Sequence, residues 1–95
     1  MQRRFRPADR AVFRELDGEA IILHLDTGLY FGLDVVGTCI WRGLERQESV
    51  AAVVGALVAE FEVEEVQAGR DVVRLIDELA GRGLLVPEPA GADEQ

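Results

Sequence analysis

The first half of the chain contains three short apolar runs separated by turn residues. The runs are residues 11 to 16, 19 to 25 and 29 to 33. The first alternates apolar and polar side chains, and the other two are rich in branched or aromatic side chains. Between them stand Asp17-Gly18 and Asp26-Thr27-Gly28, residue types that favour tight turns. This pattern predicts a three-stranded antiparallel meander. Its third strand is an edge that stays uncovered unless the chain returns to it.

From residue 34 the apolar positions recur every three or four residues, which is the period of a helix. Asp34 and Ser49 are N-cap candidates, because a short polar side chain can accept a hydrogen bond from a free N–H group of the first turn. Each precedes an apolar helical stretch. A third helix begins at residue 64 or 65 and stops at Gly83, in a C-cap position. The predicted order is three strands followed by three helices.

The third helix has an apolar arc that covers about half of its circumference, wider than the roughly 100° that one packing face needs. The centre of the arc holds Val72, Leu75 and Leu79, and one flank holds Val66 and Val73. Either a small helical cluster uses the whole arc, or part of it is free for a partner. Periodicity alone does not separate these two interpretations.

Length and composition fit one small domain, because 95 residues with 48% apolar and 29% charged side chains are typical of an ordinary globule. We expect this domain at residues 11 to 86, between a flexible Arg-rich arm at residues 1 to 10 and a disordered acidic tail at residues 87 to 95. No run is long and apolar enough to span a membrane, and no signal peptide is recognisable. A cytoplasmic protein without a membrane partner is expected.

The charge argues against nucleic acid as a partner. The formal charge is −8, and all ten basic residues are Arg. Four Arg and one Asp give residues 1 to 10 a local charge of +3, which leaves −11 on the rest of the chain. A domain that contacts phosphates needs clustered basic residues on its folded body instead.

Residue types for catalysis or metal binding are scarce. His24 and Cys39 are the only histidine and cysteine, so the chain alone has neither a disulfide nor a His/Cys metal site of normal ligand number, and no base close in sequence accompanies Cys39. Ser49 is better explained as a helix cap, and Trp41 as a core residue. The glycine spacing fits neither a dinucleotide-binding nor a phosphate-binding loop. We therefore expect a protein that is not an enzyme and that uses no metal or cofactor.

Two segments carry a resemblance to a known family. The run LDGEAIILHLDTGLYFGLDVVGTCIWRGL, residues 16 to 44, combines two turns, an apolar strand, an aromatic strand and a Gly-containing helix with Ile-Trp. The run DVVRLIDELAGRGLL, residues 71 to 85, adds a closing helix with a Gly-Leu-Leu end. Their order and spacing over residues 11 to 86 resemble PqqD-like domains. These domains are recognition elements of pathways that make ribosomally synthesised, post-translationally modified peptides.

The resemblance implies an α+β fold that is winged helix-turn-helix-like and that binds the leader peptide of a precursor. Family members hold the leader as a strand added to the third strand, in the groove beside the third helix, which is recognition by β-augmentation. Carried onto this chain, the strand residues are Leu29, Tyr30, Phe31, Gly32 and Leu33. The helix residues chosen for the groove are Val66, Gly69, Arg70, Val73, Arg74 and Asp77. The opposite flank, near Asp71, Glu78 and Arg82, is the alternative.

The implied pathway is lasso-peptide biosynthesis, because a free-standing domain with a Tyr-Phe-Gly strand and an Arg-rich start resembles the leader-binding proteins of that branch. Such a protein works as a monomer with a separate leader peptidase and a cyclase. A second interpretation is a peptide chaperone for a radical SAM enzyme. Two others are a winged-helix DNA-binding regulator and a structural subunit that dimerises through its free edge. The first is disfavoured because the charge of the third helix is at best neutral.

Overall fold

The chain folds as the predicted three strands and three helices, with one small sheet added. The computed structural model describes residues 4 to 87. The three-stranded sheet consists of β2 (Ala11–Leu16), β3 (Glu19–His24) and β4 (Tyr30–Leu33), joined antiparallel in the order β2-β3-β4. The helices that follow are α1 (Val35–Glu45), α2 (Val50–Phe61) and α3 (Glu65–Gly81). The α+β architecture predicted from the sequence is confirmed.

Local signals in the sequence set the helix boundaries. The Asp34 carboxylate accepts a hydrogen bond of 2.8 Å from the Gly37 N–H, and the Ser49 hydroxyl accepts one of 3.1 Å from the Ala52 N–H. Both residues are therefore the N-caps that were predicted. Helix α3 ends before Gly83, whose φ of +76° is a left-handed conformation that glycine adopts without strain.

A two-stranded sheet closes the domain and was not predicted. Strand β1 (Phe5–Pro7) pairs antiparallel with β5 (Leu85–Pro87), so residues 5 to 7 are not part of a flexible arm, and residue 87 ends a strand rather than starting a tail. Phe5 stabilises this arrangement, because its side chain is only 3% exposed within the core. The rest of the predicted acidic tail, residues 88 to 95, lies outside the described residues, as do residues 1 to 3.

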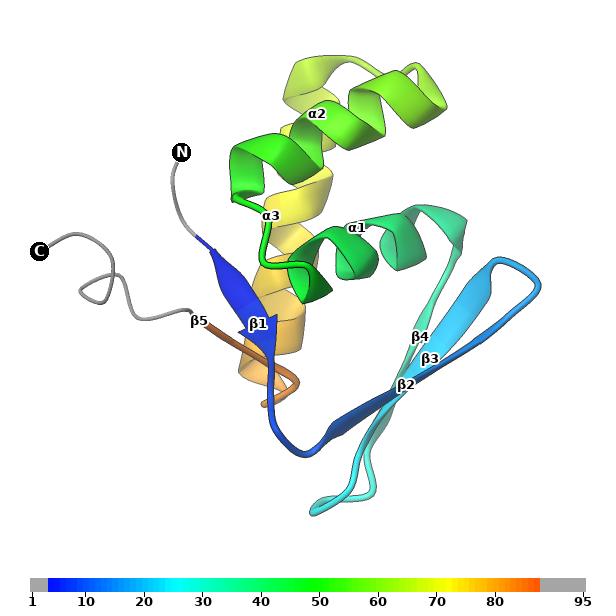
Figure 1. Cartoon of the computed structure of the whole chain (residues 1–95), viewed down its shortest axis with the longest axis vertical. Coiled ribbons are helices and arrows are strands. Elements are labelled where there is room, and N and C mark those ends of the chain that lie inside the picture. The colour runs from blue at the N-terminus through cyan, green and yellow to red at the C-terminus, as the bar shows by residue number, and fades with distance from the viewer. Residues whose placement is uncertain (1–3, 88–95) are drawn as a thin grey trace, which may run out of the picture.

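The core lies between the three-stranded sheet and the helices (Figure 1). Trp41 is 1% exposed at its centre and stacks on Phe13, with 6.1 Å between the ring centroids. The predicted core role of Trp41 is confirmed. The Arg42 guanidinium lies over the Phe13 ring and forms an ion pair with Glu15, and both of these partners belong to β2. Strand β2 and helix α1 are thus joined by both apolar and charged contacts.

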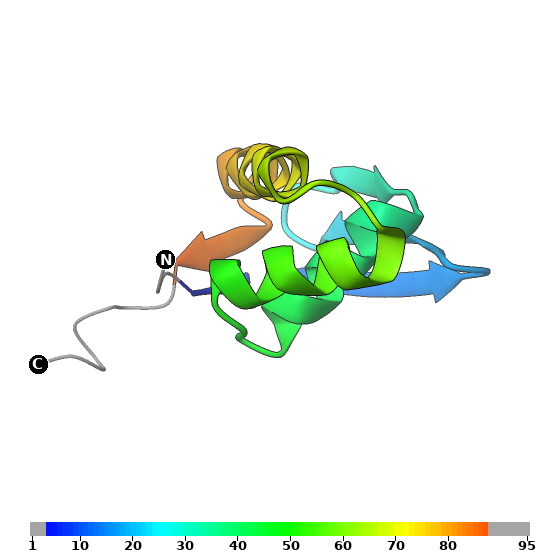
Figure 2. The ribbon, with the colours of Figure 1, turned by 90° about the horizontal axis from the view of Figure 1, so that it is seen from above.

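Helix α3 buries one narrow stripe and leaves two flanks. The buried residues are Ala68, Val72, Ile76 and Leu79. In the view along α3, helix α2 lies on one side of it and strand β4 on another (Figure 2). The two flanks therefore face different neighbours. Within residues 4 to 87, no helix is long and apolar enough to cross a membrane.

Candidate peptide-binding groove beside strand β4

Strand β4 has one unpaired edge. In the described sheet it pairs only with β3, through Leu23↔Tyr30, Ile22↔Phe31, Ile21↔Gly32 and Ala20↔Leu33. Just before the strand, the His24 N–H donates a 2.9 Å hydrogen bond to the Leu29 carbonyl. Hydrogen-bonded and non-hydrogen-bonded pairs alternate in an antiparallel ladder, so Phe31 and Leu33 direct their main-chain groups to β3. The N–H and C=O groups of Tyr30 and Gly32 consequently point to the open edge.

Successive side chains of β4 point alternately to solvent and to the core. Leu33 is buried and Phe31 half-buried against the core, whereas Tyr30 is 71% exposed on the outer face. Gly32 has no atom within 4 Å of the place where a Cβ would stand, so the outer face of the strand is open there. A peptide that pairs with this edge would direct every second side chain to the inner face, beside Phe31 and Leu33.

A groove of about 450 Å³ runs along that inner face, between β4 and α3. Its apolar lining comes from Phe31, Leu33, Val36, Ile40 and Leu75. Its polar lining includes Asp34 at the start of α1 and three charged residues on α3, which are Asp71, Arg74 and Glu78. The groove therefore has an apolar base and one charged wall.

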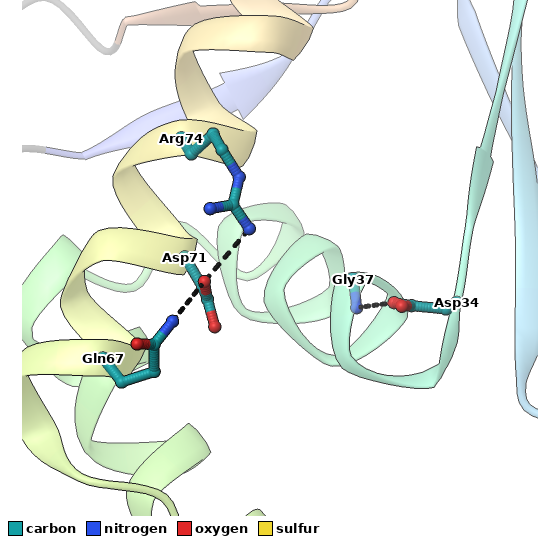
Figure 3. A network of polar contacts seen from close by, with 5 residues as sticks. All are labelled: Asp34, Gly37, Gln67, Asp71 and Arg74. Atoms are coloured by element: carbon teal, nitrogen blue, oxygen red, sulfur yellow. Dashed lines mark hydrogen bonds and ion pairs between the residues drawn. The ribbon is translucent and has the colours of Figure 1, made fainter.

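The charged wall is held together by contacts within α3. Asp71 accepts hydrogen bonds of 3.0 Å from both the Gln67 amide and the Arg74 guanidinium (Figure 3). At the far end of the helix, the Arg82 guanidinium carbon lies 5.0 Å from the centroid of the Phe31 ring. Since Arg82 follows α3 and Phe31 belongs to β4, this cation–π contact joins the two walls at one end of the groove.

The predicted strand residues and the predicted helix residues do not all meet. Of the six α3 positions chosen from the sequence, only Arg74 lines the groove beside β4. Val66, Gly69, Arg70, Val73 and Asp77 line a different cavity of about 700 Å³, against Val50 and Val54 of α2. Arg74 and Glu78 stand between the two and border both. In the structure this flank therefore faces α2 rather than the third strand, and its part in peptide binding stays a prediction. The opposite flank, kept as the alternative, contains Asp71 and Glu78 and leads to Arg82.

Leu75 is the groove residue that the sequence reasoning assigned to packing. It lies at the border between the buried stripe and the charged wall, and it is only partly buried. Helical periodicity reveals two flanks, but only the path of the chain after β4 decides which one faces the sheet.

His24 and Cys39, the only histidine and cysteine of the chain, both lie outside the groove. The His24 Nδ1 atom accepts a 3.2 Å hydrogen bond from the Asp26 N–H, and its ring lies beside Gly83. Burial raises the pKa of the half-buried Cys39 thiol, and the nearby Glu60 carboxylate raises it further. A raised pKa keeps this thiol protonated and weakly nucleophilic. In residues 4 to 87, no three His, Cys, Asp or Glu side chains are grouped so that they could hold a metal ion.

Comparison with known proteins agrees with this geometry. A family model described as coenzyme PQQ synthesis protein D (PqqD) matches residues 19–85. The chain belongs to the PqqD family. The matched segment of this PqqD domain begins at β3 and ends in β5, so it includes both walls of the groove. No curated protein matches the chain.

Two solved structures are similar to this PqqD domain. TbiB1, in complex with the TbiA(beta) leader peptide, has 39% sequence identity and a TM-score of 0.80, and the match covers 84% of this chain and 93% of TbiB1. A lasso peptide synthetase B1, complexed with the leader peptide, has 29% identity and a TM-score of 0.80, with 87% and 98% of the two chains covered.

Proposed function

We propose that this protein captures the leader peptide of a precursor by adding it as a strand to the open edge of β4. The unpaired main-chain groups of Tyr30 and Gly32, beside an apolar groove, are the observation that carries the proposal. Two similar proteins have been solved with a leader peptide bound, which supports the same role here.

The chemistry of this capture divides between backbone and side chains. The N–H and C=O groups of Tyr30 and Gly32 form up to four hydrogen bonds with the leader backbone, and these depend little on its sequence. Leader side chains on the inner face enter the groove over Phe31, Val36 and Leu75. Burial of one apolar side chain there contributes about 1.5 to 3 kcal/mol before the cost of ordering the peptide.

The captured precursor is delivered to enzymes on other chains. The Cys39 thiol is kept protonated, and the described residues contain no group of His, Cys, Asp or Glu that could hold a metal ion, which supports chemistry carried out by partner enzymes. Similarity to TbiB1 and to a lasso peptide synthetase B1 favours a leader peptidase and a cyclase as these partners. The protein itself acts as a monomer, because a leader bound to the edge of β4 occupies the strand edge through which two copies could pair.

A second candidate partner is a radical SAM enzyme, for which the domain acts as a peptide chaperone. The match to the PQQ synthesis protein D family favours it. Both candidates use the same groove and differ in the enzyme that receives the peptide. A co-purification of the tagged protein from its native cells, with mass spectrometry of the retained proteins, separates a peptidase from a radical enzyme.

Hydrogen–deuterium exchange with a defined probe tests the proposed capture. The TbiA(beta) leader peptide is added in excess, and amide exchange is followed by NMR. We expect saturable binding and slower exchange at Tyr30 and Gly32, because these amides become hydrogen-bonded. Protection confined to another surface, or no binding at millimolar peptide, would contradict the proposal.

A further inference from the structure

The α3 wall of the groove carries one charged side chain on almost every turn. Asp71, Arg74 and Glu78 line the groove, and Arg82 follows Glu78 by one turn. Arg74 is paired with Asp71 at 3.0 Å, and Arg82 lies over the Phe31 ring. Glu78 differs from the others, because its carboxylate has no ion pair or hydrogen bond with any other described residue.

The position of Glu78 along the groove follows from its neighbours. It stands between Arg74, on the side of Asp71, and Arg82, which marks the Phe31 end. One helical turn rises about 5.4 Å and two strand residues about 6.7 Å, so successive inner-face side chains of an added strand pass α3 roughly one per turn. A single leader side chain on the inner face, level with the turn between Arg74 and Arg82, therefore comes nearest to Glu78.

The charge around this position favours a cation. Asp34, Asp71 and Glu78 give the groove lining three carboxylates. Arg74 pairs with Asp71, and Arg82 adds one cation at the Phe31 end, so Asp34 and Glu78 leave the balance negative. The formal net charge of the whole chain, these residues included, is −8. A basic side chain here gains a partner that no residue of the described chain supplies, and an acidic one meets like charge.

We propose that Glu78 is a specificity-determining residue of the groove and selects a Lys or Arg side chain at the leader position that comes nearest to it. This inference rests on the proposed capture of a leader by β4. Selection by charge complements the apolar base, because the Leu75 and Val36 surface accepts many apolar side chains with little discrimination between them. A carboxylate on the wall distinguishes leaders that the apolar base does not.

A charge scan of the leader tests this assignment. Single Lys and single Glu substitutions are placed at every position of the TbiA(beta) leader peptide, and the affinities for the wild-type protein and for Glu78→Lys are measured by fluorescence anisotropy. We expect one position at which Lys binds about two- to fivefold more tightly than Glu to the wild type. At that position the order should reverse with Glu78→Lys.

Asp77→Lys is the matched control, because Asp77 is the neighbouring carboxylate and lines the cavity on the α2 side but not the groove beside β4, whereas Glu78 borders both. It changes the net charge by the same amount but should leave the order at that position unchanged. If both variants shift all positions equally, the effect is the overall field of the protein and Glu78 selects nothing. A uniform affinity across the scan, with protection of Tyr30 and Gly32 retained, would overturn the selection by Glu78 and leave the proposed capture intact.

Discussion

The guanidinium carbon of Arg82 lies 5.0 Å from the centroid of the Phe31 ring, and this contact connects the end of α3 to the edge strand β4. Phe31 also belongs to the apolar lining of the groove. The same ring therefore supports the sheet, the helix and the surface on which a peptide would lie. Its neighbours in sequence, Tyr30 and Gly32, carry the main-chain groups at the open edge.

Loss of the Arg82 side chain should weaken the link between the two walls. We expect Arg82→Ala to lower the free energy of unfolding by about 0.5 to 1 kcal/mol, the usual size of an exposed cation–π contact. Urea denaturation followed by circular dichroism measures it. Arg70→Ala, on the opposite flank of α3 and without a described ring partner, is the control and should change stability less. Equal losses in both variants would contradict a specific role for the contact with Phe31.

Proline substitutions distinguish the two sides of β4. Gly32→Pro removes an N–H group that points to the open edge, so leader affinity should fall by about 1 to 3 kcal/mol while the fold remains. Tyr30→Pro should act in the same way, because position 30 is the first residue of the strand. Isothermal titration with the TbiA(beta) leader peptide measures the change.

Phe31→Pro should destabilise the fold, whereas the two substitutions above should weaken only the binding of the leader. The Phe31 N–H group belongs to the ladder with Ile22, so proline there disrupts the β3–β4 pairing. We expect a clear loss of thermal stability, which far-UV circular dichroism reports. Intact stability in Phe31→Pro, together with destabilised Gly32→Pro, would show that the hydrogen-bonding phase of the strand is inverted.

The two flanks of α3 can be compared directly by truncation. Leu75→Ala removes apolar surface from the groove and should lower leader affinity by about three- to tenfold. Val73→Ala removes apolar surface from the α2 side, where the residue is 44% exposed, and should leave the affinity within about twofold. Titration calorimetry of both variants decides which flank contacts the leader, since the opposite result would restore the flank chosen from the sequence.

Alanine at Gly43 of α1 and at Gly55 of α2 should change stability in opposite directions. A Cβ at Gly43 would stand 2.9 Å from Cγ2 of Val53, so Gly43→Ala should destabilise the domain by about 1 to 3 kcal/mol. A Cβ at Gly55 in α2 meets nothing within 4 Å, and Gly55→Ala should stabilise the domain by about 0.5 to 1 kcal/mol. Thermal unfolding of the two variants gives the sign of each change.

The raised pKa of Cys39 predicts slow alkylation. Because burial keeps the thiol protonated, iodoacetamide should react more slowly with the folded protein than with the urea-unfolded chain at the same pH. The folded pKa lies above the unfolded one, so the associated stability is fully present at neutral pH and is lost as the pH rises through the alkaline range. Equal reaction rates in both states would show that the thiol is not shielded.

Most of the fold follows from local signals in the sequence, and the remaining parts do not. Turn residues and the two N-caps gave the meander and the starts of α1 and α2 because each acts over a few neighbouring positions. Strands β1 and β5 have three residues each, too few for a recognisable period, and each exists only because the other is present. The flank of α3 that faces β4 is likewise a long-range property, which Leu75 and Glu78 do not reveal on their own.

The pairing of β1 with β5 has a consequence for synthesis of the chain. The β2–β4 meander and the first two helices can form while β5 is still inside the ribosome, but the pairing of β1 requires that last strand. Contacts of such large sequence separation form late, since loop closure must precede them. The small sheet is therefore the final part of the domain to assemble on the ribosome, and trimming the chain before Leu85 would leave β1 without a partner and expose the Phe5 ring to chaperones and proteases.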